Sequence, residues 1–136
     1  MEQTSEVIGE TADTAVVVSR TLPHPVKKVW DVLMTDEGSE ALLGPGAHFG
    51  QKGYTWQSHD GRQGVIRTFH PLEEIRFSWR MKDAATPSMV AVNLTVADEE
   101  STEVEIKHNR LESGANHNWL TDRWSAALDR IESECM

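Results

Sequence analysis

The C-terminal part of the chain carries a clear helical pattern of apolar positions. From Asn116 to Cys135, apolar side chains recur at steps of three or four residues, with one single step, and so fall on one side of a helix. These positions are Leu120, Trp124, Ala127, Leu128, Ile131 and Cys135. Ser113, Asn116 and Asn118 are candidate caps for its start. A helix of roughly five turns needs a broad apolar partner surface.

The preceding half of the chain instead alternates between apolar and polar residues, which is typical of strands with one buried face. The clearest run is Ile75 to Lys82, where Ile75, Phe77, Trp79 and Met81 share one face. Further strands are predicted over Thr14–Leu22, Tyr54–Ser58, Gly64–His70, Val90–Val96 and Val104–His108, with a hairpin turn at Asp60-Gly61 and a loop over Asp83–Ser88. A sheet with one wet face indicates antiparallel pairing.

Two short helices are predicted between the first strand and the others. Val26, Val29, Trp30 and Leu33 mark the first, with Pro25 as its first residue. The second covers Asp36–Leu43 and ends at Gly44-Pro45-Gly46. The order is therefore one strand, two short helices, five strands and a long helix. This segregation predicts an α+β fold in which a sheet wraps the C-terminal helix.

Length and charge limit the classes of function. A chain of 136 residues is long enough for one domain, which we place at 14–136 after a mobile acidic tail at 1–13. The net charge of −9 disfavours nucleic acids and anionic membranes as partners. Cys135 is the only cysteine, and neither a signal peptide nor a segment long enough to span a bilayer is present. We expect a cytoplasmic protein.

Four segments of the chain form a recognisable series. The first is Arg20-Thr-Leu-Pro-His-Pro-Val-Lys-Lys-Val-Trp-Asp-Val-Leu33. The others are Gly64–Trp79, Ile106-Lys-His108, and Arg123-Trp124 with Leu128 and Ile131. Together they resemble the START-like, or SRPBCC, superfamily, and within it the proteins similar to the C-terminal domain of the activator of heat-shock-protein ATPase. The resemblance implies a helix-grip fold with a cavity between the curved sheet and the long helix. This chain has Leu42-Leu43-Gly44-Pro45 where the family often has paired tryptophans.

Motifs for catalysis or metal binding are weak. The six histidines show no ligand spacing, so we predict no metal and no cofactor. The chain has no Gly-x-Ser-x-Gly motif, and an enzyme would have to use His108, Tyr54 or Arg67 for acid–base chemistry. His108 is the only histidine at an inward position of a predicted strand. It is either a hydrogen-bonded core residue or a ligand contact.

The aromatic residues are the better candidates for a binding site, either as plain core or as the lining of a cavity. The predicted ligand-binding residues are Tyr54, Trp56, Phe77, Trp79, Met81, His108 and Trp124. Flat indoles and a flexible methionine suit a small lipophilic or aromatic molecule, which is the first functional hypothesis. The alternatives are a stress-response or co-chaperone-like domain that binds proteins on its outer face, and an enzyme of cyclase or dehydratase type.

Overall fold

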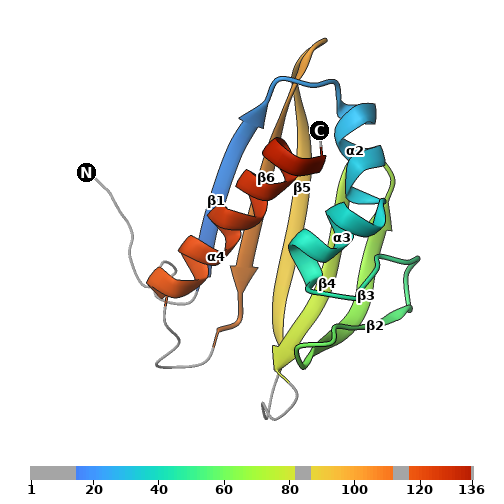
Figure 1. Ribbon diagram of the computed structural model, residues 1–136, viewed down its shortest axis with the longest axis vertical. Coiled ribbons are helices and arrows are strands. Elements are labelled where there is room, and N and C mark those ends of the chain that lie inside the picture. Colours follow the sequence, from blue (N-terminus) through green and yellow to red (C-terminus); the bar gives the residue numbers. More distant parts are fainter. Residues whose placement is uncertain (1–14, 82–86, 112–116, 136) are drawn as a thin grey trace.

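The computed structural model describes residues 15–81, 87–111 and 117–135, without the side chains of residues 81, 134 and 135. Its elements confirm the predicted order (Figure 1). They are β1 (Ala15–Leu22), α2 (Val26–Leu33), α3 (Asp36–Leu43), β2 (Thr55–Gln57), β3 (Arg62–His70), β4 (Glu74–Met81), β5 (Ser88–Asp98), β6 (Ser101–Asn109), α4 (His117–Arg130) and the π-helical turn Ile131–Cys135. The predicted tail at 1–13 lies outside the described residues.

The strands form one six-stranded antiparallel sheet in the order β1-β6-β5-β4-β3-β2. The first strand in the sequence therefore joins the last one, with Val18 opposite Ile106. Hairpins connect the remaining neighbours, and the Asp60-Gly61 turn forms as predicted, with Gly61 at a φ of +96°. A left-handed φ of this kind is readily adopted by glycine.

All three α-helices lie on the same face of the curved sheet, which confirms the predicted grip around α4 (Figure 1). The largest fully buried side chains come from both layers: Trp56, Trp124, Phe77, Leu22, Leu33, Leu42, Leu43, Ile66, Ile75, Ile106, Leu128 and Ile131. The inward positions expected from the period of two are buried in β4, at Ile75, Phe77 and Trp79, and in β5, at Val90, Val92 and Leu94. The same alternation predicts an inward Val96, but the β5–β6 hairpin extends beyond the helices at its far end and Val96 is 59% exposed.

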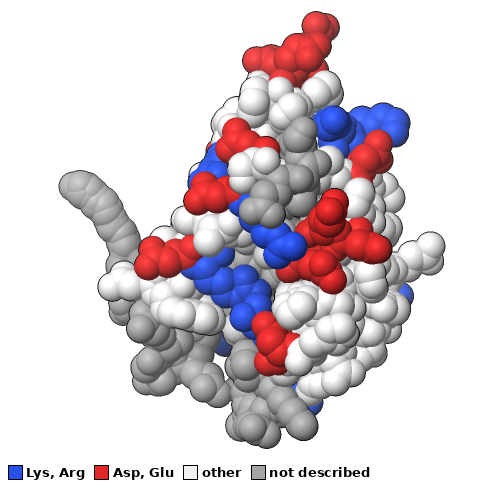
Figure 2. Space-filling view, in the orientation of Figure 1, with Lys and Arg blue, Asp and Glu red and all other residues white. Residues whose placement is uncertain are grey.

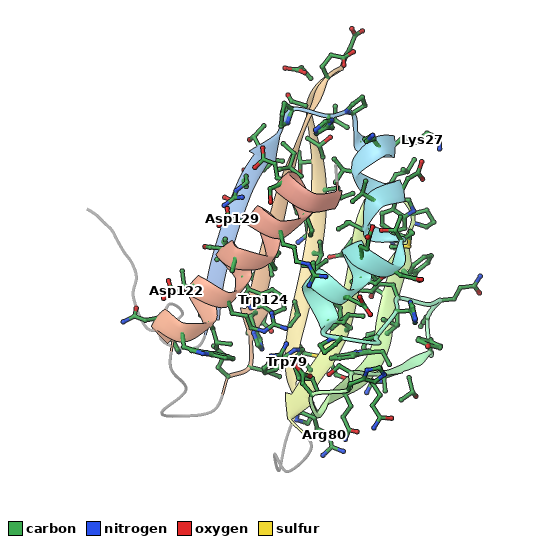
Figure 3. All side chains as sticks on the ribbon, in the orientation of Figure 1. Lys27, Trp79, Arg80, Asp122, Trp124 and Asp129 are labelled. Carbon is green, nitrogen blue, oxygen red and sulfur yellow. The ribbon has the colours of Figure 1, made fainter. Side chains whose placement is uncertain are left out.

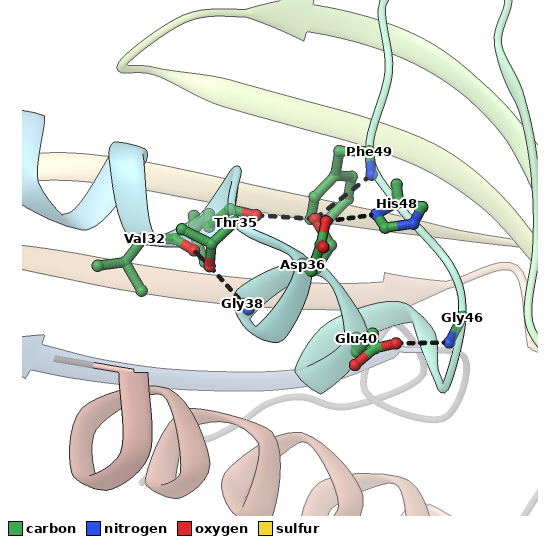
Figure 4. A network of polar contacts seen from close by, with 10 residues as sticks. Val32, Thr35, Asp36, Gly38, Glu40, Gly46, His48 and Phe49 are labelled. Atoms are coloured by element: carbon green, nitrogen blue, oxygen red, sulfur yellow. Dashed lines mark hydrogen bonds and ion pairs between the residues drawn. The ribbon is translucent and has the colours of Figure 1, made fainter.

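Side-chain caps fix the short helices and the loop that follows them (Figure 4). Thr35 caps α3 by accepting a hydrogen bond from the Gly38 amide at 3.1 Å. Glu40 then accepts from the Gly46 amide at 2.8 Å, and His48 lies 3.1 Å from the Asp36 carboxylate. These contacts hold the loop after α3 against the helix itself.

Two predicted helix starts are wrong by about a turn or less. Pro25 is not the first helical residue but the N-cap of α2, because its ψ of 155° is extended. Asn118 lies inside the first turn of α4 and is therefore no cap, while Ser113 and Asn116 lie outside the described residues. No helix in the described part of the chain is both long and apolar enough to cross a membrane.

An ion pair attaches the C-terminal helix to the edge of the sheet. The guanidinium of Arg20 on β1 lies 2.6 Å from the Asp129 carboxylate and 3.5 Å from that of Glu132. Asp122 and Asp129 lie along the side of α4 that faces away from the sheet interior (Figure 3). The apolar stripe of α4 points inward as predicted, with Leu120, Trp124 and Leu128 buried.

Candidate functional site

The predicted aromatic residues form two groups on the inner face of the sheet. In the first group, the Trp56 ring packs edge-on against Phe77 with the ring centroids 5.8 Å apart. Phe49, from the loop after α3, also packs edge-on against Phe77, with the ring centroids 5.7 Å apart. The Trp56 indole N–H also donates to the Ser78 carbonyl at 3.2 Å. This group is a tightly packed part of the core.

The second group places Trp79 of β4, His108 of β6 and Trp124 of α4 together (Figure 3). The His108 ring lies edge-on to both indoles, with centroids 5.0 Å from Trp79 and 5.8 Å from Trp124. Tyr54 joins neither group. Its side chain is 45% exposed because β2 begins only at Thr55, beyond it. The side chain of Met81 is outside the described residues.

A chain of hydrogen bonds, here called the histidine network, runs through His108. The Trp124 indole N–H donates to Nδ1 of His108 at 3.2 Å. An indole can only donate, so Nδ1 carries no proton and the ring proton is on Nε2. Nε2 lies 2.6 Å from the Ser88 hydroxyl oxygen, to which it donates. The hydroxyl in turn donates to the Trp79 carbonyl at 2.9 Å, so every polar atom in the network has a partner.

His108 is held neutral by this environment. Burial, and secondarily the positive charge of Arg123, lowers the pKa of His108 from its ordinary 6.5 to about 4. Both ring nitrogens are occupied by protein hydrogen bonds, so neither is available to take a proton from a substrate without breaking the network. Of the two predictions for His108, a hydrogen-bonded core residue or a ligand contact, its geometry fits the first.

Ser88 was assigned to a loop by its sequence, and this was wrong. It is the first residue of β5, buried and paired with Trp79 across the strands. The preceding proline and the polar character of serine both favoured a loop. The signal that identifies Ser88 is its position two residues before Val90, in phase with the inward-facing positions of the same strand.

Two arginines, here called the arginine pair, border the second aromatic group. Arg62 begins β3, directly after the hairpin turn, and Arg123 precedes Trp124 on α4. The guanidinium carbon of Arg123 lies 4.6 Å from the Trp124 ring centroid and 5.9 Å from that of Trp79. The guanidinium carbon of Arg62 lies 6.0 Å from the Trp79 centroid. Both cations thus interact with the same indole.

The contacts that hold the arginine pair come from the hairpin turn and from α3. Nη2 of Arg62 lies 3.2 Å from the Asp60 carboxylate, which also accepts a hydrogen bond from the Ser58 hydroxyl. Nη2 of Arg123 donates to the Leu42 carbonyl at 3.2 Å and so connects α4 to the end of α3. Gly44, at the end of α3, allows this segment to lie close to Ser58 before the hairpin turn, because a Cβ at position 44 would lie 2.9 Å from the Ser58 Cβ. Its φ of +119° also favours glycine.

Three N–H donors in this region are buried and have no acceptor among the described residues. They are Nε of Arg62, Nε of Arg123 and the indole Nε1 of Trp79. Buried polar groups in proteins are nearly always hydrogen-bonded, so a group of three without partners needs an explanation. Arg62 lies in no motif of the sequence, and Arg123 belongs only to the segment Arg123-Trp124 that carries the family resemblance. Their meeting depends on tertiary packing that no local pattern encodes.

The opposite face of the sheet carries a second feature. A pocket of about 860 Å³, here called the outer-face pocket, lies over strands β3 to β6. Its charged lining consists of Arg67, Glu74, Arg76, Glu105, Lys107 and Arg110. Arg67, one of the acid–base candidates, therefore faces away from His108 and the aromatic groups.

The fold and the inner-face site define a helix-grip protein. Residues 23–135 match the family described as Activator of Hsp90 ATPase homolog 1-like protein, and the chain belongs to this family. No curated protein matches the sequence.

Solved structures agree with the assignment of the fold. A Chromobacterium violaceum protein superposes with a TM-score of 0.73 at 14% identity, covering 90% of this chain and 97% of that one. An Hsp90 activator from Plasmodium falciparum gives 0.73 at 15% identity, covering 88% and 94%. The Aha1 dimer from Colwellia psychrerythraea gives 0.71 at 13% identity, covering 89% and 95%. Identities this low support a shared fold and leave the function of this chain to its own residues.

Proposed function

We propose that the protein binds a small, largely aromatic molecule on the inner face of the sheet, next to Trp79 and the arginine pair. The observation that carries this proposal is the set of three buried N–H donors, from Trp79 and the two arginines near its ring, for which the described residues offer no acceptor. A ligand that brings acceptor atoms to these donors would remove the cost of leaving them unpaired.

The surroundings of these donors suit an aromatic ligand. The faces and edges of Trp79 and Trp124 offer stacking partners, and apolar burial supplies most of the binding energy of small molecules in such sites. A ligand would enter beside the arginine pair, because the Arg62 side chain is 19% exposed to solvent, whereas Trp124 and His108 are fully buried. Entry therefore requires movement of flexible side chains rather than of the sheet.

A fluorescence titration with N-phenyl-1-naphthylamine, a neutral aromatic probe, tests the proposal. We expect a saturable increase with one probe bound per chain. Trp79→Ala should weaken it, and Trp119→Ala, at a position 51% exposed on α4, should not. No saturable signal with the folded wild-type protein would exclude the proposed function, and this result does not depend on whether a variant folds.

A second candidate, favoured by the family description and by the outer-face pocket, is a co-chaperone-like protein interaction. Charged residues on one face of an exposed sheet suit contact with a protein surface of complementary charge. The test measures the ATPase rate of a purified Hsp90 chaperone with and without this protein. Stimulation that is lost in Arg76→Glu and Lys107→Glu, and kept in Trp79→Phe, would place the interaction on the outer face.

A further inference from the structure

We infer that the ligand of the inner-face site carries an oxyanion, a carboxylate in the simplest case, and that Arg62 and Arg123 bind it. This inference rests on the proposed function and adds the chemical class of the ligand. It starts from the geometry of the arginine pair. Both guanidinium groups lie near the ring of Trp79, and the guanidinium carbon of Arg123 also lies over the Trp124 ring, 4.6 Å from its centroid.

A cation–π contact uses the charge of a guanidinium and none of its N–H groups. The N–H groups lie in the guanidinium plane, where a carboxylate binds with two parallel hydrogen bonds. For Arg62 and Arg123, one Nη of each is used by Asp60 or by the Leu42 carbonyl. The Nε–H of each has no acceptor among the described residues. The indole N–H of Trp79, near whose ring both guanidinium groups lie, is a third buried donor without an acceptor in the described part of the chain.

The charges of the described residues also leave room for one anion. Asp60 pairs with Arg62, and no other carboxylate among the described residues forms an ion pair with either member of the arginine pair. His108, the next ionisable group inward, is neutral near pH 7. The site thus combines two positive charges with one negative charge, in a chain whose net charge is −9. Figure 2 shows basic side chains gathered in the middle of the face that α3 and α4 cover, bordered by acidic ones.

The pKa of Arg123 supports the same conclusion. Burial, and then repulsion from Arg62, lowers it to about 10, against a smaller opposing effect of Asp60. Two partly desolvated cations therefore repel each other across a site with a single counter-charge. A bound carboxylate would attract both at once and supply acceptors to donors that lack them. A neutral ligand would supply acceptors but would leave the repulsion in place.

The test compares 2-naphthoate with 2-naphthamide, which share one ring system and nearly the same shape and differ in charge. Affinities are measured by amide NMR titration of the wild-type protein and of Arg62→Gln, Arg123→Gln and Arg67→Gln. The last variant loses the same charge from the outer face and is the matched control. We expect wild type to bind naphthoate at least about tenfold more tightly than naphthamide, the size typical of a hydrogen bond between charged groups.

The ratio of the two affinities should fall towards one in Arg62→Gln and Arg123→Gln, and should stay at the wild-type value in Arg67→Gln. Arg123→Lys keeps the charge without the planar fork and should give an intermediate ratio. Equal binding of both compounds by wild type would overturn the inference and leave the proposed function standing. If neither binds, both fail. Preferential naphthoate binding that survives both glutamine variants would overturn the role of the arginine pair.

Discussion

Two neighbouring parts of the inner face differ in whether their buried hydrogen-bond donors have acceptors. In the histidine network, each N–H and O–H from Trp124 to the Trp79 carbonyl has an acceptor in line. Around the arginine pair, three N–H donors have none among the described residues. The two regions meet in one residue, because the carbonyl of Trp79 belongs to the network and its indole N–H is one of the unpaired donors.

The contrast separates stability from binding. A fully paired buried network connects β4, β5, β6 and α4 and strongly favours one arrangement of them. Unpaired donors cost free energy in the unliganded protein, and a ligand can recover that cost. Substitutions in the first region should therefore change stability, whereas substitutions in the second should change binding more than stability.

The largest effect is expected from Trp124→Ala. Removing a fully buried indole leaves a cavity and deprives His108 of its donor, so the free energy of unfolding should fall by about 3–5 kcal/mol. Urea unfolding followed by circular dichroism measures it. The matched control, Trp119→Ala, removes an exposed indole from the same helix and should stay within about 0.5 kcal/mol of wild type. Similar losses of unfolding free energy in both variants would contradict a stabilising role for the buried Trp124 indole.

The pH dependence of stability should report the neutral state of His108. Its pKa of about 4 in the folded protein lies below the ordinary 6.5, so the unfolded chain binds more protons between these values. The stabilisation is therefore complete above pH 6.5 and is lost as the pH falls towards 4, by at most about 3 kcal/mol. Unfolding in urea at a series of pH values measures the slope. A His108→Gln variant keeps all carboxylates and should show a smaller slope, and equal slopes would argue against a buried neutral histidine.

Ser88→Ala should cost less, because it removes one partner and no large side chain. The Nε2–H of His108 would lose its acceptor and the Trp79 carbonyl its donor, which should lower the free energy of unfolding by about 1–3 kcal/mol. Thermal unfolding of Ser133→Ala provides the control. The Ser133 hydroxyl donates an exposed hydrogen bond to the Asp129 carbonyl of α4, and its removal should change stability by about 0.5 kcal/mol or less. An equal effect of both changes would show that the network contributes little.

Local patterns predicted the burial of the core and not the pairing of polar groups. The apolar period of α4 and the alternation in β4 identified Trp124 and Phe77 as buried, because burial follows the geometry of each element alone. The strand phase of His108 was predictable in the same way. Arg62 and Arg123 instead come from the start of β3 and from α4, which meet only in the folded chain. A local sequence pattern depends only on residues a few positions apart, so it could not indicate that both arginines lie next to Trp79.

The smallest effect is expected when each of the two indoles that pack against His108 is replaced by phenylalanine. These two variants also give the most direct comparison of the two regions. Trp124→Phe and Trp79→Phe remove the same atoms, but the first breaks a hydrogen bond to His108 and the second removes a donor that has no acceptor among the described residues. Trp124→Phe should therefore destabilise the protein by about 1–2 kcal/mol more than Trp79→Phe, which should lie within about 1 kcal/mol of wild type. Urea unfolding of the two variants side by side measures the difference. Equal losses would mean that the indole N–H of Trp79 finds an acceptor in solution as good as His108 is for Trp124, and the distinction between the two regions would then disappear.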